Sequence, residues 1–224
     1  MGFEKQPTTN NFRPFQLRLN NKTRAMERSM SKDHCFEPHL FLNEYLEQFI
    51  RAYPDSPKAS LIWPSYFAHD YPDDPFHADK QYLRLFERNR EEFDNSFVFF
   101  MADHGLRVGW LSRHPDGKRD VNNPMLMISV PRRMRENKYL IANLKKNSGE
   151  LLTMFDTHAT LVDIVETLSG RVQADFSKTA MKPELKGTSL LRPLPQITRN
   201  CKTLPIPPQY CLCEIAKEPV KFVV

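Results

Sequence analysis

A run of five apolar residues, Phe97 to Met101, leads almost directly into the tripeptide Asp103-His104-Gly105. A short apolar run rich in Phe and Val is typical of a buried β-strand. A carboxylate and an imidazole behind such a strand would lie at its C-terminal edge, where open α/β sheets bind their ligands. The glycine allows the backbone to turn sharply below them. The sequence therefore predicts an α/β fold with functional residues at this edge.

The same tripeptide indicates a metal site. Asp and His supply the oxygen and nitrogen ligands that zinc and manganese accept, so Asp103 and His104 are candidate metal ligands. The alternative is a strand-to-loop turn in which Asp103 caps the backbone and His104 faces solvent. The tripeptide is compatible with both the metal site and the turn, and a motif this short often recurs by chance.

A second candidate pair, His69-Asp70, follows the apolar and aromatic stretch 59–67. We expect this stretch to be a strand with an edge position or a bend at Pro64, because proline is confined to such places in sheets. His69 would then project from the same sheet edge as Asp103. The alternative for His69 is a loop histidine that is hydrogen-bonded to a nearby carboxylate.

Hydrophobic periodicity predicts two helices in the first half of the chain. Residues 1–35 are polar and irregular. One helix covers 38–53 and stops at Pro54, and a second covers 78–93, with apolar side chains on one face of each.

In the second half of the chain, the sequence predicts strands followed by a helix. After the strand that ends before Asp103, a polar loop leads to Asn123, and residues 125–130 form a second strand. Asp156 is expected to cap a helix that ends at Gly170.

Proline and polar residues dominate after residue 170, so we divide the chain into residues 1–170 and an irregular tail, 171–224. The tail holds three of the four cysteines: Cys201, Cys211 and Cys213. Their spacing suits zinc poorly, so we expect a disulfide-stapled tail in an oxidising compartment, with free thiols as the alternative. Cys35 could complete an even count, and the sequence leaves the connectivity open.

The net charge of +5 includes two basic clusters, at residues 132–135 and 145–146. Because aromatic residues do not alternate with these charges, we do not expect a nucleic-acid partner. An anionic ester would suit the same positive field. No stretch approaches the ~20 apolar residues of a membrane helix, and the first residues do not open a signal peptide.

These motifs together resemble the alkaline-phosphatase superfamily of sulfatases, nucleotide pyrophosphatases and lipoteichoic-acid synthases. The likeness is strongest to its domain-of-unknown-function family 229 and covers most of residues 2–213. Besides the Asp103 strand, it rests on five segments in the family's order: Arg13-Pro14-Phe15, His69-Asp70, Phe155 to Leu161, Gly187 to Leu190 and Tyr210 to Cys213.

The resemblance implies a partial three-layer α/β/α alkaline-phosphatase-like core with the irregular Pro- and Cys-containing tail. Asp103 and His104 would bind a divalent metal ion, either zinc, manganese or magnesium. His69 and Asp70 would contact substrate or a second metal ion. The family likeness also implies an extracellular or secretory-lumen location. His158 lies on a helix that is structural in sulfatases, so it is not expected to be a ligand.

The implied substrate is a phosphate or sulfate ester on an anionic small molecule, glycan or lipid, with Arg107 and Lys118 as weaker anion contacts. The sequence also departs from the family pattern. Val121 and Asn122 replace a charged pair, and Ala102 stands where Ser is usual. These differences indicate relaxed constraint or a changed substrate.

Superfamily members place an acidic metal ligand and then a Thr, Ser or modified Cys nucleophile before the region that residues 1–15 resemble. Neither Thr8, Thr9 nor Thr23 follows an apolar strand, and Cys35 lacks the Pro and Arg of a modified cysteine. We therefore expect the C-terminal part of a metal-dependent ester hydrolase that is inactive alone. The alternatives are a non-catalytic secreted or lumenal binding protein of the same fold, and an incomplete product that does not fold stably.

Overall fold

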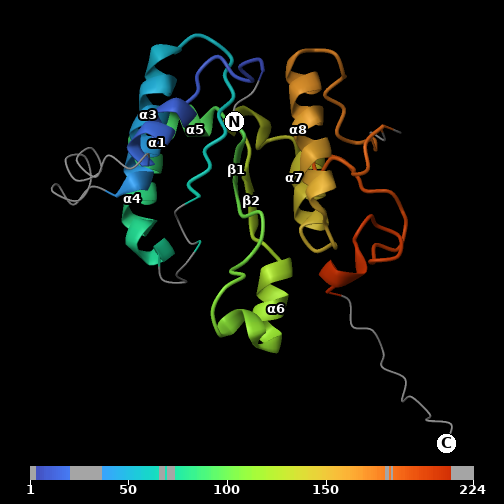
Figure 1. The fold of residues 1–224 in the computed structure, drawn as a ribbon. Helices are drawn as coiled ribbons and strands as arrows, with labels where there is room; N and C mark the ends of the chain where they lie inside the picture. The colour runs from blue at the N-terminus through green and yellow to red at the C-terminus, as the bar shows by residue number, and fades with distance from the viewer. Residues whose placement is uncertain are drawn as a thin grey trace, which may run out of the picture. The chain divides into compact units, whose positions relative to one another are not determined.

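The computed structural model describes residues 4–20, 37–65, 69, 74–179, 182 and 184–212. The chain divides into two compact units, Met1–Phe93 and Asp94–Val224, and each is described by itself (Figure 1). Within the described residues, no helix is both long enough and apolar enough to cross a membrane.

The first unit consists of helices, with α1 (Arg13–Asn20), α3 (Pro38–Ala52) and α4 (Asp74–Arg88). The short α5 (Arg90–Asp94) ends at the boundary between the units. Helix α3 confirms the helix predicted over 38–53. The helix predicted over 78–93 begins earlier, at Asp74, and is interrupted at Asn89.

Two predictions for the first unit are wrong. Helix α1 lies in a region expected to be irregular. The described part of the predicted strand 59–67, residues 59–65, has no strand. Its apolar side chains face outward instead, with Leu61 83% and Trp63 60% exposed. The apolar run therefore does not bury itself in a sheet, and Pro64 lacks the N–H that a ladder requires.

Polar side chains share the buried face of α3 at intervals of four residues: His39, Asn43 and Glu47. The Glu47 carboxylate accepts a hydrogen bond of 2.8 Å from Asn89 Nδ2 and pairs with Arg88 at 3.2 Å. The His39 ring stacks on Tyr82 of α4, with 6.0 Å between the ring centroids. The two helices therefore meet through polar as well as apolar contacts.

The sheet of the second unit pairs β1 (Val98–Met101) with β2 (Leu126–Ser129) in antiparallel fashion. Both predicted strands are confirmed, and Phe99 lies opposite Ile128. Antiparallel pairing places the end of β1 beside the start of β2, so the connection between them leaves from one end of the sheet. The described structure is a mixed one, with helices and this small sheet.

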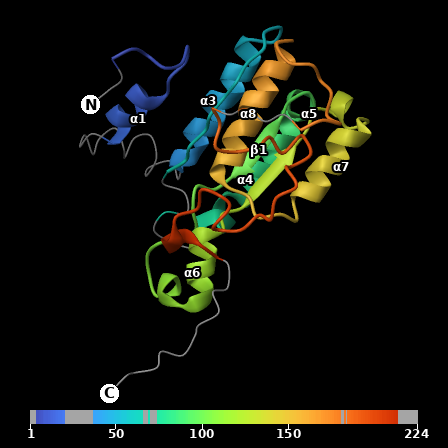
Figure 2. The same cartoon turned by 90° about the vertical axis from the view of Figure 1, so that its right-hand side faces the viewer.

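One face of the sheet packs on helices α7 (Lys138–Asn147) and α8 (Met154–Leu168), as both views show (Figures 1 and 2). Partly buried side chains of the sheet, among them Phe99 and Ile128, contact the core cluster. That cluster contains five buried residues: Val130, Leu140, Ile164, Phe176 and Leu191. Burial of this apolar surface holds the second unit together.

The N-cap of helix α8 lies three residues before the predicted cap. Thr153 is the N-cap and Asp156 is the third residue of the first turn. The Asp156 carboxylate accepts a 2.8 Å hydrogen bond from the Thr153 N–H, and Thr153 Oγ1 accepts one of 3.4 Å from the Asp156 N–H. This reciprocal capping box satisfies two backbone donors, so the acid was identified correctly but its role was not. The predicted end at Gly170 is confirmed by its positive φ of 73°.

The segment 187–199 has no helix or strand, as predicted, yet all five residues from 188 to 192 are buried. Arg192 pairs with Asp163 of α8 at 2.9 Å, and Arg199 pairs with Asp156 at 2.7 Å. Each of these four side chains is less than a tenth exposed. A Cβ at Gly187 would lie 2.1 Å from the Phe155 carbonyl oxygen, so the close approach to α8 requires glycine.

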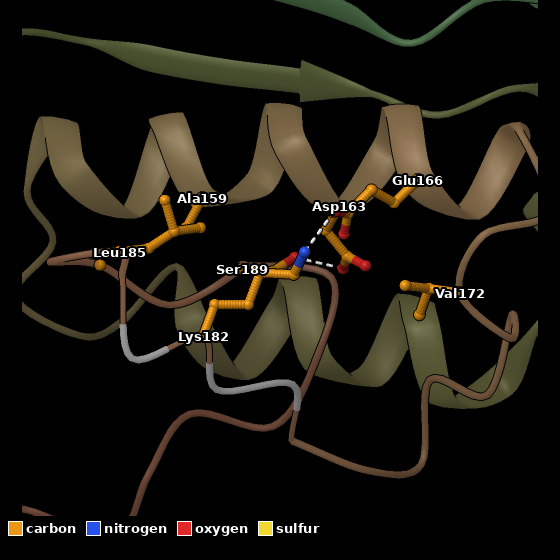
Figure 3. Close-up of a pocket in the computed structure, with 8 residues that line it drawn as sticks. Ala159, Asp163, Glu166, Val172, Lys182, Leu185 and Ser189 are labelled. Atoms are coloured by element: carbon orange, nitrogen blue, oxygen red, sulfur yellow. Dashed lines mark hydrogen bonds and ion pairs between the residues drawn. The ribbon is translucent and has the colours of Figure 1, made fainter.

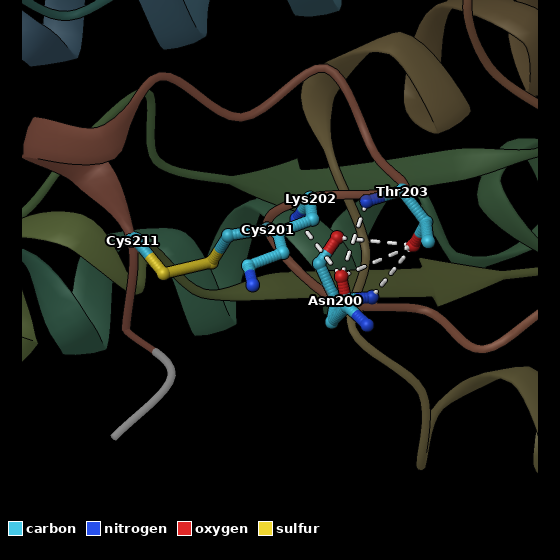
Figure 4. The surroundings of a disulfide bond; sticks show 5 residues. All are labelled: Asn200, Cys201, Lys202, Thr203 and Cys211. Carbon is cyan, nitrogen blue, oxygen red and sulfur yellow. Dashed lines mark hydrogen bonds between the residues drawn. A yellow bond between two sulfur atoms is a disulfide. The ribbon is translucent and has the colours of Figure 1, made fainter. Parts of the chain in front are cut away.

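A disulfide joins Cys201 and Cys211, which confirms a stapled tail (Figure 4). The side chain of Asn200, the residue before Cys201, accepts hydrogen bonds from the N–H groups of Lys202 and Thr203 at the start of the closed loop. Cys35 and Cys213 lie outside the described residues.

Replacing Asp156 by Asn leaves Arg199 buried without a counter-charge. We expect Asp156→Asn to lower the free energy of unfolding by about 3–5 kcal/mol, as measured by urea unfolding. Asp79→Asn, which changes an exposed acid, is the control. Adding Arg199→Gln to Asp156→Asn should recover part of the loss, and no recovery would contradict the pairing.

Removing the Cys201–Cys211 link releases a loop with a sequence separation of 10 residues. The loop-entropy model gives a loss of about 2–3 kcal/mol. We expect the Cys201→Ser/Cys211→Ser variant to unfold at lower urea concentration than the oxidised protein. Equal midpoints would show that the crosslink does not contribute to stability.

Burial lowers the pKa of His39 below its ordinary value of 6.5, and the Glu37 carboxylate at 3.4 Å opposes this shift only in part. The unfolded chain then binds the proton more readily, so stability is lost as the pH falls through about 6.5. We expect the urea midpoint to fall between about pH 7.5 and pH 5.5. His39→Gln should weaken this dependence. A variant that keeps the full pH dependence would contradict the assignment.

Candidate functional site

The predicted metal pair follows β1 directly. Asp103 and His104 begin the connection from β1 to β2, and their side chains are 54% and 31% exposed. His104 Nε2 lies 3.5 Å from Asp103 Oδ2. The two side chains therefore face each other at the end of the sheet and remain open to solvent.

The His104 ring is oriented by the backbone. Its Nδ1 atom lies 2.7 Å from the carbonyl oxygen of Gly105, which can only accept, so Nδ1 carries the hydrogen. In the neutral ring Nε2 then holds the lone pair, and this is the atom that faces Asp103. Metal-binding histidines are commonly held in this way, through a hydrogen bond from the other ring nitrogen.

Gly105 fixes the turn against α6 (Pro115–Asn122). The Gly105 N–H donates to the Val121 carbonyl oxygen at 3.0 Å. A Cβ at this position would lie 2.5 Å from the Asp120 backbone oxygen and 2.9 Å from its carboxylate. Only glycine fits this approach, so the motif is locked to the C-terminal end of α6. The polar loop expected here is wrong in part, because it contains this helix.

The separation of the two ligand atoms suits a shared cation. Two ligands of a tetrahedral zinc ion, with bonds of about 2.0–2.1 Å, lie roughly 3.4 Å apart. The 3.5 Å between His104 Nε2 and Asp103 Oδ2 matches this value. Within the described part of the chain, no group of three or more His, Cys, Asp or Glu side chains is placed to hold a metal ion. Asp103 and His104 by themselves would supply two ligands to a metal ion.

The remaining predicted residues divide between the two units. His69 is an exposed residue of the first unit, and Asp70 lies outside the described residues. Arg107 and Lys118 are exposed residues of the connection that also carries Asp103. Lys118 lies on α6, whose end contacts Gly105, and both cations belong to the same β1–β2 connection as Asp103 and His104.

A second polar cluster, which the sequence analysis did not identify, lies beside α8 around a cavity of about 100 Å³ (Figure 3). Asp163 accepts a 2.6 Å hydrogen bond from Ser189 Oγ, and Glu166 forms an ion pair with Lys182. The only sequence signal was an acid on the inner face of an otherwise apolar helix. Because Asp163 is also paired with Arg192, we assign this cluster a structural role.

Comparison with known proteins places these features in a family. The family model described as "Protein of unknown function (DUF229)" matches residues 1–221. No curated protein and no solved structure matches the chain. The match spans nearly the whole sequence, including the Asp103-His104-Gly105 turn and the disulfide-linked tail. The chain therefore belongs to the DUF229 family of proteins of unknown function.

Proposed function

We propose that this chain provides the Asp103 and His104 ligands of a divalent metal site in a hydrolase of phosphate or sulfate esters. The observation that carries the proposal is the 3.5 Å separation of His104 Nε2 and Asp103 Oδ2. The proposed ion is zinc, manganese or magnesium, and the 3.5 Å separation matches tetrahedral zinc best. The proposed fold is a partial three-layer α/β/α core of the alkaline-phosphatase type, and the described sheet would be part of its central layer.

The chain's own residues would prepare the site in two ways. The Gly105 carbonyl holds the proton on His104 Nδ1 and leaves Nε2 available, while Asp103 supplies negative charge beside it. Arg107 and Lys118 would attract an anionic ester to this end of the sheet. When bound, a divalent ion stabilises the charge that develops on the ester oxygens.

His69 and Asp70 remain proposed contacts to substrate or to a second metal ion. Catalytic metal sites commonly have three protein ligands, so the pair requires at least one more ligand, and a nucleophile, besides the residues assigned here. We therefore expect weak metal binding and no ester hydrolysis by the purified chain. A secreted or lumenal location is part of the same proposal, and the Cys201–Cys211 disulfide is compatible with it.

A non-catalytic binding protein of the same fold is the second candidate. It is favoured by Val121 and Asn122, which stand where related hydrolases are expected to carry charge. The two candidates differ in metal dependence, because a binding protein of this kind would keep its partner after chelation.

The metal pair predicts a specific loss of affinity. We expect Asp103→Ala and His104→Ala each to weaken zinc or manganese binding by at least about tenfold, because each removes one of two ligands. Binding can be measured by competition with a chromophoric chelator. His158→Ala is the matched control, since His158 is an exposed histidine on α8 outside this site.

Circular dichroism should show that all three variants keep their helices. Unchanged affinity in Asp103→Ala, or equal losses in His158→Ala and His104→Ala, would refute the ligand assignment. Hydrolysis of p-nitrophenyl phosphate or sulfate by the purified chain would contradict the expected inactivity and would favour the hydrolase over the binding protein.

A further inference from the structure

The connection from β1 to β2 contains a turn, residues 106–113, in which apolar side chains are exposed to solvent. Trp110 is 79% exposed and Val108 is 43% exposed. The turn is well defined: Gly109 has a φ of 86°, Ser112 Oγ donates to the Gly109 carbonyl at 3.0 Å, and the Arg113 N–H donates to the Trp110 carbonyl at 3.1 Å. We call this segment the Trp110 turn.

Two arginines flank Trp110 in the sequence. Arg107 and Arg113 lie three residues before and after Trp110, and both are exposed. Among the described residues, neither forms an ion pair with an acid, and Lys118 on α6 forms none either. Arg192 and Arg199, in contrast, are each paired with a buried carboxylate. The charges beside Trp110 are therefore available to an external anion.

We propose that the Trp110 turn binds the surface of a membrane that contains anionic lipids. A tryptophan ring has an apolar body and a polar N–H, and such rings favour the boundary between lipid headgroups and acyl chains. Val108 adds apolar area beside it, and the arginines can pair with lipid phosphates. Each cation near an anionic membrane surface adds further to the affinity.

Other anionic partners fit the turn less well. A single-stranded nucleic acid is bound by several aromatic rings that stack successive bases, whereas Trp110 is the only aromatic residue of residues 106–113. A sulfated sugar chain could pair with the arginines, but it would leave Val108 without a partner. The combination of an exposed apolar pair with flanking cations favours a lipid surface.

This contact would bring the Asp103 side of the sheet to the membrane, because Asp103 and Trp110 belong to the same connection. The proposal is nevertheless independent of metal binding at Asp103 and His104. Vesicle binding and metal binding are measured separately. The membrane proposal can therefore fail while the metal-ligand assignment stands, and the reverse is also possible.

The chain has two tryptophans, and Trp63 belongs to the first unit, so a matched experiment is possible. In the full-length Trp63→Phe variant, Trp110 is the only tryptophan. We expect its fluorescence to shift to the blue on adding vesicles with about 30% phosphatidylserine in phosphatidylcholine, and to be quenched by brominated lipid. Trp110→Ala should lower vesicle binding by at least about tenfold, whereas Trp63→Ala should leave it unchanged.

The charge contribution is tested by Arg107→Gln/Arg113→Gln, which should weaken binding by about 30-fold at low salt. Added salt should weaken the binding of the parent protein in the same direction. No blue shift with anionic vesicles would overturn the proposal. It would also be overturned if a sulfated oligosaccharide, and not the vesicles, changed the Trp110 fluorescence.

Discussion

The antiparallel ladder between β1 and β2 is the constraint on which the second unit depends. It aligns four residue pairs, from Val98 opposite Ser129 to Met101 opposite Leu126. Because side chains alternate along a strand, this register directs Phe99 and its partner toward α7 and α8, and a shift of one residue would turn them to the opposite face. The same pairing holds both ends of the β1–β2 connection together, so the Asp103 turn and α6 meet at one end of the sheet.

Side-chain hydrogen bonds, and not sheet pairing, hold the segment after Gly187 against α7 and α8. The segment after Gly187 is rich in proline, and its described part, residues 188–212, forms no ladder with β1 or β2. Its buried backbone groups are satisfied by side chains of α7 and α8: Asn147 Nδ2 donates to the Leu190 and Arg192 carbonyls, and Thr160 Oγ1 accepts from the Leu190 N–H. These hydrogen bonds explain how a segment without regular structure can be buried. The positive charges of its two buried arginines, Arg192 and Arg199, are neutralised by Asp163 and Asp156 of α8.

Local sequence signals predicted the parts of the fold that local forces determine. Helices α3 and α8 carry clear apolar periodicity, both strands lie in short apolar runs, and the turn that contains Asp103 was located correctly. Helix α6 was missed because its sequence has no apolar stripe and depends on contact with the preceding turn. The strand predicted over 59–67 failed because an apolar run specifies burial only if a partner strand exists. The pairing of Asp163 with Arg192 joins residues 29 apart, which spacing alone does not reveal.

The Gly105 carbonyl accepts the hydrogen of His104 Nδ1, so Nε2 is the ring atom that we propose to bind the metal ion. Long-range ¹H–¹⁵N NMR of the imidazole rings tests this arrangement, because it reports the tautomer and the metal contact of each of the seven histidines. We expect neutral His104 to carry its hydrogen on Nδ1 and zinc to shift its Nε2 resonance, while His158 is unaffected. A hydrogen on Nε2, or a zinc titration that leaves the His104 ring unchanged, would show that His104 Nε2 is not the metal-binding atom.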